Sequence, residues 1–482
     1  MGKKSVKFFQ RRSARLGREA DEKVKKSYEI DMVHGPLLGK MLIFAVPLMI
    51  SGVLQLLFNA ADIIVVGRFS GSQALAAVGS TGALINLLVN VFMGLSIGAN
   101  VLTARYVGAK DDKELSDTVH TAILLSLVSG VILVFLGLFL AEPLLTLMGT
   151  PEDVLAQATL YMRIYFCGMP ATMLYNFGSA ILRAVGDTKR PLYFLLIAGC
   201  INVVLNLFFV IVVGIDVAGV AIATVISQCV SAVLVLLCLM HTDSAYRVSL
   251  KKLKIHRAKL LQIARVGLPA GIQGAIFSVS NVLIQSSVNS FGSTVVAGNS
   301  TSSNLEGFIY TSMNAVYQTS LSFTSQNLGA GRRSRLTPIL FRCLGVVVSV
   351  GVGLGILFYL FRYQLLGIYT PDQEVIQYAI VRLELICATY FLCGIMDTCC
   401  GSIRGLGYSV LPTVVSLTGA CGLRILWIFT VFAWDHSLFT LYLSYPVTWG
   451  VTAAAHLICF FVIMKKKGKQ DVPPLAQQQA EA

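Results

Sequence analysis

The chain has 482 residues, of which 55% are hydrophobic and only 13% charged, and its mean hydropathy is +0.74. This composition excludes an ordinary soluble domain and a disordered chain. The net charge of +14 would suit a nucleic-acid-binding protein, but the Lys and Arg residues gather in the tails and in short segments between apolar runs. Basic segments of that kind mark the cytoplasmic loops of membrane proteins, so we expect an integral membrane protein without a nucleic-acid partner.

The first apolar run, residues 41–68, is long enough to cross a bilayer as a helix. Eleven further runs follow, at about residues 74–104, 118–141, 154–182, 191–213, 217–240, 261–290, 295–326, 336–361, 375–402, 411–434 and 439–464. The gaps after the even-numbered runs hold most of the basic residues, which places those gaps and both termini in the cytoplasm. We therefore predict an all-α protein with twelve transmembrane helices.

An internal repeat divides the chain into two halves. Marker residues of the first half recur 221 or 222 positions later: Pro47 as Pro269, Gly52 as Gly274, Asn59 as Asn281, Gly108 as Gly329 and Arg183 as Arg404. Because six crossings per half is an even number, the halves should share one orientation and be related by an axis along the membrane normal. Two pseudo-symmetric six-helix bundles of this kind can rock and open a path between them alternately to each side.

The repeat and the charge pattern together predict the domain boundaries. They are a basic cytoplasmic tail at 1–35, an N-lobe with the first six helices at 36–241, a basic cytoplasmic linker at 242–260, a C-lobe with the last six helices at 261–465, and a cytoplasmic tail at 466–482.

Polar residues share one face of the first run. Ser51, Gln55, Asn59 and Asp62 follow at spacings of four, four and three. A carboxylate at membrane depth is costly unless it is protonated, binds a cation or faces a wet cavity, so Asp62 is a candidate ion-coupling residue. The alternative is a place near the aqueous rim, because Arg68 marks a helix end about 9 Å further on.

Asp62 also breaks the repeat, since its partner by offset is Ile284. Asn202 and Asn206 lie four apart on one face of the fifth run and could help Asp62, together with Asn59, to hold H⁺ or Na⁺. Taken singly, each asparagine fits a structural hydrogen bond between helices equally well. Apart from a possible Na⁺ at Asp62, we expect no metal site.

The eighth run carries a second polar face, which is typical of a cavity wall. Its members, at spacings of three or four, are Asn299, Ser303, Glu306, Tyr310, Asn314 and Tyr317. Glu306 has Ile85 as its repeat partner, and Asp397 in the tenth run has Asn176, so both acids belong to the second half alone. The predicted substrate cavity, attractive to cations, comprises Gln55, Glu306, Tyr310, Asn314, Tyr317 and Asp397.

Other charged residues have simpler interpretations. Asp397 fits an ion pair with Arg404, two turns on, as well as it fits a cavity. We expect structural or interfacial ion pairs for Arg163, Arg382, Glu384 and Arg424. The lone His120 and His456 lack a second ligand at metal spacing and should make core or helix contacts.

The chain lacks the motifs of ATP-driven pumps and enzymes. No glycine-rich loop ends in Lys, no nucleophile elbow is present, and no pair of histidines flanks a glutamate. We therefore expect a secondary transporter without a cofactor, driven by an ion gradient, and not a membrane enzyme. A passive channel is a further alternative, but it would not require Asp62 to bind and release an ion in every transport cycle.

Several segments resemble the multidrug and toxic compound extrusion (MATE) antiporters over roughly residues 36–465. They are VPLMISGVLQLLFNAADIIVVGR, ANVLTARYVGAKDD, ILRAVGDTKRPLYF and GVAIAT, with SFTSQNLGAGRR and SIRGLGYSVLP as their echoes. The resemblance implies two six-helix bundles that export diverse, often cationic organic compounds across the plasma membrane in exchange for H⁺ or Na⁺. We expect a monomer whose partners are these small molecules, the coupling cation and the lipid bilayer.

In the branch of the family that keeps its ion site in the first lobe, an Asp late in the first helix works with an Asn and an Asp on the fifth. Asp62 and Asn202 match that pattern, whereas Asn206 stands where the second Asp usually is. The resemblance thus implies a site with a single carboxylate, for which we favour H⁺. The alternative is a lipid-linked oligosaccharide flippase of the same superfamily, which should show more cationic residues facing the central cavity.

Overall fold

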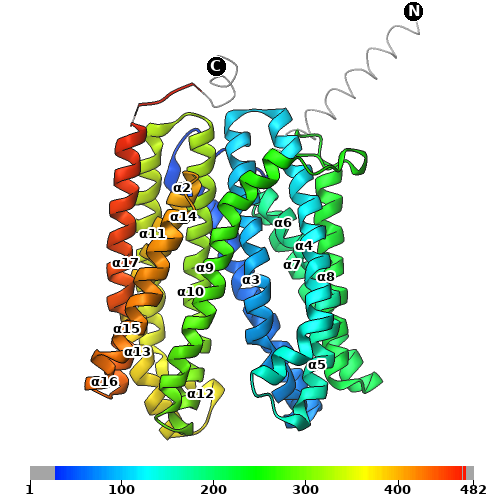
Figure 1. Ribbon diagram of the computed structural model, residues 1–482, viewed down its shortest axis with the longest axis vertical. Coiled ribbons are helices and arrows are strands. Elements are labelled where there is room, and N and C mark those ends of the chain that lie inside the picture. Colours follow the sequence, from blue (N-terminus) through cyan, green and yellow to red (C-terminus); the bar gives the residue numbers. More distant parts are fainter. Residues whose placement is uncertain (1–27, 469, 474–482) are drawn as a thin grey trace, which may run out of the picture.

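The computed structural model describes residues 28–468 and 470–473, and this part of the chain is helical without any strand. Figure 1 shows two helical bundles side by side, and the described part of the chain begins and ends at the same end of the molecule. Of the predicted tails, residues 1–27, 469 and 474–482 lie outside the described residues.

The first half contains α2 (Leu37–Phe69), α3 (Gly71–Ala109), α4 (Asp112–Leu147), α5 (Glu152–Cys167), α6 (Met169–Ala184), α7 (Lys189–Leu207), the π-helix η1 (Phe208–Val213) and α8 (Asp216–Met240). The linker holds the short 3₁₀-helix η2 (Leu250–Lys252). The second half contains α9 (Arg257–Asn289), α10 (Ser293–Gly329), η3 (Arg333–Arg335), α11 (Leu336–Leu360), α12 (Arg362–Tyr369), α13 (Gln373–Gly405), α14 (Val410–Ser416), the π-helix η4 (Leu417–Gly422), α15 (Leu423–Phe429), α16 (Val431–Trp434) and α17 (Leu438–Lys467).

Ten helices of the described chain are long and apolar enough to cross a membrane, and two further crossings depart from that pattern. The fourth crossing is divided at Gly168 into α5 and α6, where Pro170 near the start of α6 supplies no backbone N–H. The eighth, α10, has 37 residues but is polar, with buried Asn299 and Glu306 among its members. With these two, the predicted twelve crossings and the all-α fold in two bundles are confirmed.

Each lobe has its own hydrophobic core, and the first helix of each half crosses from one core to the other. Met41 and Phe44 near the start of α2 pack in the core of the C-lobe, while Val66 near its end packs in that of the N-lobe. The helix α9 does the reverse, with Ile263 in the N-lobe core and Ile284 in the C-lobe core. The two lobes therefore exchange the beginnings of their first helices.

The helices α3 and α9 join the lobes through glycines. A Cβ atom on Gly94 would lie 2.2 Å from the backbone nitrogen of Gly271, and one on Gly98 would lie 2.2 Å from the carbonyl oxygen of Ile263. Gly94 and Gly98, like Gly267 and Gly271, are four residues apart, a spacing that lets helix backbones approach closely in membranes. No larger residue fits at these positions without separating the two helices.

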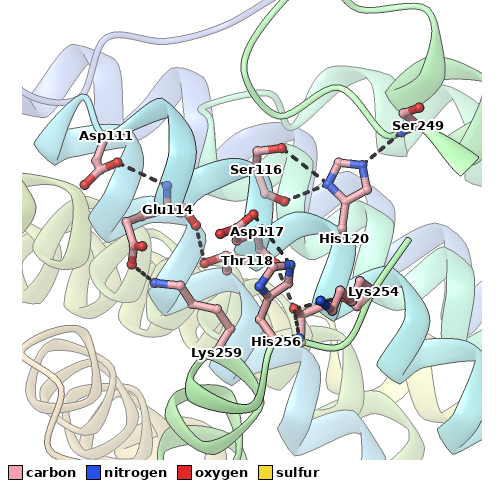
Figure 2. A network of polar contacts seen from close by, with 11 residues as sticks. Asp111, Glu114, Ser116, Asp117, Thr118, His120, Ser249, Lys254, His256 and Lys259 are labelled. Carbon is pink, nitrogen blue, oxygen red and sulfur yellow. Dashed lines mark hydrogen bonds and ion pairs between the residues drawn. The ribbon is translucent and has the colours of Figure 1, made fainter. Parts of the chain in front are cut away.

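The linker between the lobes packs against α4 (Figure 2). The Nδ1–H group of His120 donates to the carbonyl oxygen of Ser116 at 2.7 Å, and Nε2 accepts the backbone N–H of Ser249 at 3.0 Å. The hydroxyl of Thr121 accepts the backbone N–H of His256 at 3.2 Å. His120 is therefore a helix contact, as predicted, and it holds the linker in place.

Candidate functional site

Polar contacts join the lobes at the end of the molecule that carries both described termini. The hydroxyl of Ser322 on α10 donates to Asn100 on α3 at 3.1 Å, and that of Ser325 donates to the carbonyl oxygen of Val101 at 2.6 Å. The amide of Gln326 donates to the carbonyl oxygen of Ala184 at 3.1 Å. All three α10 side chains are buried, so this end of the lobe interface is closed.

The N-lobe brings Asp62 together with both predicted amides of α7. The Nδ2 group of Asn206 donates to the carboxylate of Asp62 and also lies 3.3 Å from Oδ1 of Asn202. Asn202 in turn donates to the hydroxyl of Thr224 on α8 at 3.4 Å. Asn59 is exposed and its side chain forms no hydrogen bond within the described residues, so it does not belong to this network.

The helix geometry changes two residues after Asn206, where α7 ends and the π-helix η1 begins at Phe208. Such π-helical turns are frequent at functional sites. Asn206 is fully buried. The Oδ1 atom of its side-chain amide has no hydrogen-bond partner in the described part of the chain. A buried polar atom without a partner is costly, and oxygen atoms of carboxylates and amides are the ligands that hard cations prefer. The residues present therefore fit a proton or a small cation.

Three residues of this cluster were missed by the sequence interpretation. Thr224 supports Asn202, and Tyr161 and Tyr165 of α5 lie within electrostatic range of Asp62. The two tyrosine rings stack with centroids 6.0 Å apart. Their four-residue spacing places them on one helix face and was visible in the sequence, but nothing there shows which helix they face.

A second candidate site is a cavity of about 590 Å³ in the C-lobe. Three residues predicted to line a substrate cavity are on its wall: Glu306, Tyr310 and Asp397. Gln55, Asn314 and Tyr317 are not on this wall. Tyr317 instead accepts a hydrogen bond from Arg404 at 2.8 Å in the interior of the lobe.

The charge of Glu306 is compensated by Arg382. The guanidinium group donates to both carboxylate oxygens, at 2.8 and 2.7 Å, and also to Oδ1 of Asn299 at 2.7 Å. Ser302 adds a hydrogen bond to Glu306 at 2.9 Å. Asp397, by contrast, lies within 4.0 Å of no basic group among the described residues. Of the two acids, Asp397 is the one without a close counter-ion.

The predicted ion pairs form for three of the four residues named. Arg163 pairs with Glu142 at 3.2 Å, Glu384 pairs with Arg362 at 3.2 Å, and Arg382 pairs with Glu306 at 2.7 Å. For Arg424 the prediction is wrong, because no carboxylate of the described chain lies within 4.0 Å of it.

Arg424 instead stacks on aromatic rings at the wall of the C-lobe cavity. Its guanidinium carbon lies 4.1 Å from the ring centre of Tyr445, and its one protein hydrogen-bond partner in the described chain is the hydroxyl of Thr448, at 3.2 Å. A signal for its special position was present in the sequence, since its repeat partner by the 221-residue offset is Val203.

Comparison with known proteins places these sites in a family. The MatE family model matches residues 47–208 and 269–430, two stretches whose starts and ends are both 222 residues apart. The chain belongs to the MatE family. MATE proteins are transporters and not enzymes, and the matched stretches correspond to the two halves of the repeat.

Individual relatives are similar over most of their length. The chain is 28% identical over 440 residues to "Probable multidrug resistance protein YoeA" of Bacillus subtilis, covering 89% of this chain and 94% of that protein. It is 25% identical over 380 residues to the "FAD transporter" of Shewanella oneidensis, covering 75% and 82%. A solved structure described as the outward-facing conformation of a multidrug resistance MATE family transporter superposes with a TM-score of 0.85 at 21% identity, covering 91% of this chain and 98% of that one. The last comparison supports the fold.

Proposed function

We propose that this MATE protein is a secondary antiporter that exports organic compounds across the plasma membrane in exchange for a cation, with Asp62 as the coupling carboxylate. The observation that carries the proposal is the contact between the half-buried Asp62 and the buried Asn206, whose own amide oxygen lacks a partner among the described residues. Binding of H⁺ or Na⁺ changes the charge of this cluster by one unit. If the ion binds two arrangements of the N-lobe unequally, this change shifts the balance between them.

The arrangement of the lobes supports alternating access. The described polar contacts of α10 with the N-lobe close one end of the interface. With both termini in the cytoplasm, as the basic loops favour, the closed end is the cytoplasmic one. The path between the lobes then opens toward the outer side of the membrane. Coupling to the ion would drive the change to the arrangement that opens toward the cytoplasm. A monomer suffices for this cycle, because both lobes belong to one chain.

The flippase alternative requires several free cationic groups facing the cavity, to hold a lipid-linked pyrophosphate. Two arginines line the C-lobe cavity, and Glu306 already compensates one of them, Arg382. A single uncompensated guanidinium is a weak match for a pyrophosphate group that carries several negative charges. We therefore favour small organic compounds as substrates.

The test is gradient-driven efflux of the fluorescent cation rhodamine 123 from proteoliposomes, with a pH gradient and a Na⁺ gradient applied separately. We expect efflux by the native protein with one gradient, H⁺ being favoured because the site holds a single carboxylate. Asp62→Asn should abolish it. The matched control is Asp216→Asn, which removes an exposed carboxylate in the first turn of α8. Uphill efflux that persists in Asp62→Asn would exclude Asp62 as the coupling residue.

A further inference from the structure

One wall of the C-lobe cavity carries a buried arginine, Arg424, that has no carboxylate within 4.0 Å among the described residues. We propose that this cavity binds substrates that combine an aromatic body with an anionic group, a carboxylate above all, and that Arg424 is the partner of that group. The inference rests on the export function proposed above and assigns it a substrate class. It differs from the sequence-based expectation of a cavity attractive to cations.

The first step is the burial of Arg424. The residue is only 6% exposed, and its Nε atom has no hydrogen-bond partner among the described residues. A guanidinium offers five N–H donors in a planar fork that matches a carboxylate. Within the described part of the chain, the hydroxyl of Thr448 is the only acceptor that receives a hydrogen bond from Arg424. Burying an unpaired charge is costly, so a carboxylate brought by a ligand would satisfy a group that the protein leaves open.

The second step concerns the other charges on the wall. Besides Arg424, the strongly charged residues that line the cavity are Glu306, Arg382 and Asp397. Glu306 and Arg382 compensate each other at 2.7 Å. Asp397 forms no ion pair with Arg424, whose electrostatic neighbours include Tyr445 and a second cation, Arg382. On the part of the wall formed by α15 and α17, the charge is therefore the positive charge of Arg424.

The third step is the aromatic lining. The rings of Tyr310, Tyr390 and Trp449 form a stacked series, with centroids 6.5 Å apart in the first pair and 5.2 Å in the second. Trp449 also meets Tyr445, on which Arg424 stacks, at 5.4 Å. Flat apolar molecules bind well to such surfaces. The volume of about 590 Å³ lies in the range of small-molecule sites.

The local fold supports a functional position for Arg424. The π-helix η4 (Leu417–Gly422) interrupts the eleventh crossing and ends two residues before Arg424. Its residues Ala420 and Cys421 are themselves on the cavity wall. Because π-helical turns recur at functional sites, the two π-helices in the described part of the chain fit the same pattern: η1 begins two residues after Asn206, and η4 ends two residues before Arg424.

The experiment compares two dyes that differ in one group. Rhodamine 110 carries a free carboxylate, and rhodamine 123 is its methyl ester. Binding to the purified full-length protein in detergent is measured by fluorescence anisotropy without any gradient. Arg424→Gln should weaken binding of rhodamine 110 by about 10- to 100-fold, the usual worth of a hydrogen-bonded charge, and leave rhodamine 123 nearly unchanged. Arg424→Lys keeps the charge but loses the fork, and should weaken rhodamine 110 less.

Arg163→Gln, which removes an exposed arginine from the N-lobe, is the matched control and should change neither dye. A competition measurement on the native protein does not depend on whether the variants fold. In it, naphthoate should displace rhodamine 110, and naphthylmethylamine should not. Equal weakening of both dyes by Arg424→Gln, or equal displacement by both competitors, would overturn the proposal. Binding needs no gradient, so it can be separated from transport. Carboxylate-dependent binding without gradient-driven efflux of either dye would refute only the antiporter function, whereas driven efflux of rhodamine 123 without rhodamine 110 binding would refute only this inference.

Discussion

Gly108 and Gly329, which occupy equivalent positions 221 residues apart in the two halves, each lie against the backbone of the other lobe. A Cβ atom on Gly108 would lie 1.9 Å from the carbonyl oxygen of Gln326 on α10, and one on Gly329 would lie 1.9 Å from that of Arg105 on α3. The pseudo-symmetry of the sequence thus reappears as a pair of reciprocal backbone contacts at the closed end of the lobe interface.

We expect Gly108→Val and Gly329→Val to force α3 and α10 apart, because backbone atoms cannot move aside as a flexible side chain can. The cost should be about 1–3 kcal/mol of stability, typical of overpacking, measured by thermal unfolding in detergent. Gly345→Val is the control, since a Cβ atom there meets nothing within 4 Å. Equal melting temperatures for all three variants would show that the close approach is dispensable.

The buried pair of Glu306 and Arg382 allows a double-mutant cycle. Arg382→Leu alone should destabilise the protein by about 3–5 kcal/mol, because it leaves the carboxylate of Glu306 buried without compensation. Combining it with Glu306→Leu should restore much of the loss. The exposed pair of Arg163 and Glu142 is the control cycle, with an expected coupling of about 0–1 kcal/mol. Additive effects in the buried pair would contradict its role as a compensated unit.

Much of the fold could be predicted because it follows from local patterns. Hydropathy and the internal repeat together give the twelve crossings, and the polar α10 is predicted because its length and its place in the repeat outweigh its composition. The contact of Asp62 with Asn206 was expected from two features, the break in the repeat and the four-residue spacing of the amides on α7.

What could not be predicted depends on which helices meet. Sequence spacing shows that Glu306 and Arg382 are unusual, but not that they pair across 76 residues, which is decided by the packing of α10 on α13. For the same reason Arg424 was expected in an ion pair. The exchange of α2 and α9 between the two cores is also a result of tertiary packing, because apolar residues recur from one end of each helix to the other and do not show which core each end meets.

The contact of His120 with the linker predicts where the protein becomes sensitive to protease. His120→Phe removes the acceptor for the Ser249 N–H group, so the lysine-rich segment at 251–254 should detach from α4 and be cleaved faster by trypsin. His241→Phe is the control, because His241 is exposed and bonds to Leu237 of its own helix. Identical digestion patterns for both variants would show that the linker is held by other contacts.

The described segment before α2 bridges the two lobes at their closed end. The backbone N–H of Ile30 donates to the carbonyl oxygen of Gly186 in the N-lobe at 3.2 Å, while the carbonyl oxygen of Met32 accepts the amide of Asn327 in the C-lobe at 3.0 Å. Met32 is fully buried. Because residues 28–36 touch both lobes at this end, their contacts depend on how the lobes are arranged.

Gly186→Val should release this segment from the N-lobe. A Cβ atom on Gly186 would lie 2.5 Å from the carbonyl oxygen of Ile30, and its φ of +100° is unfavourable for any residue with a side chain. Gly214→Val is the matched control, since Gly214 has a φ of +73° but nothing within 4 Å, so it tests the backbone strain without the contact. Hydrogen exchange of the peptide at 28–36 should accelerate in Gly186→Val and stay slow in Gly214→Val, because only the former loses the hydrogen bond of Ile30. If exchange accelerates equally in both variants, strain and not the lost contact is the cause, and the bridge does not hold the lobes together.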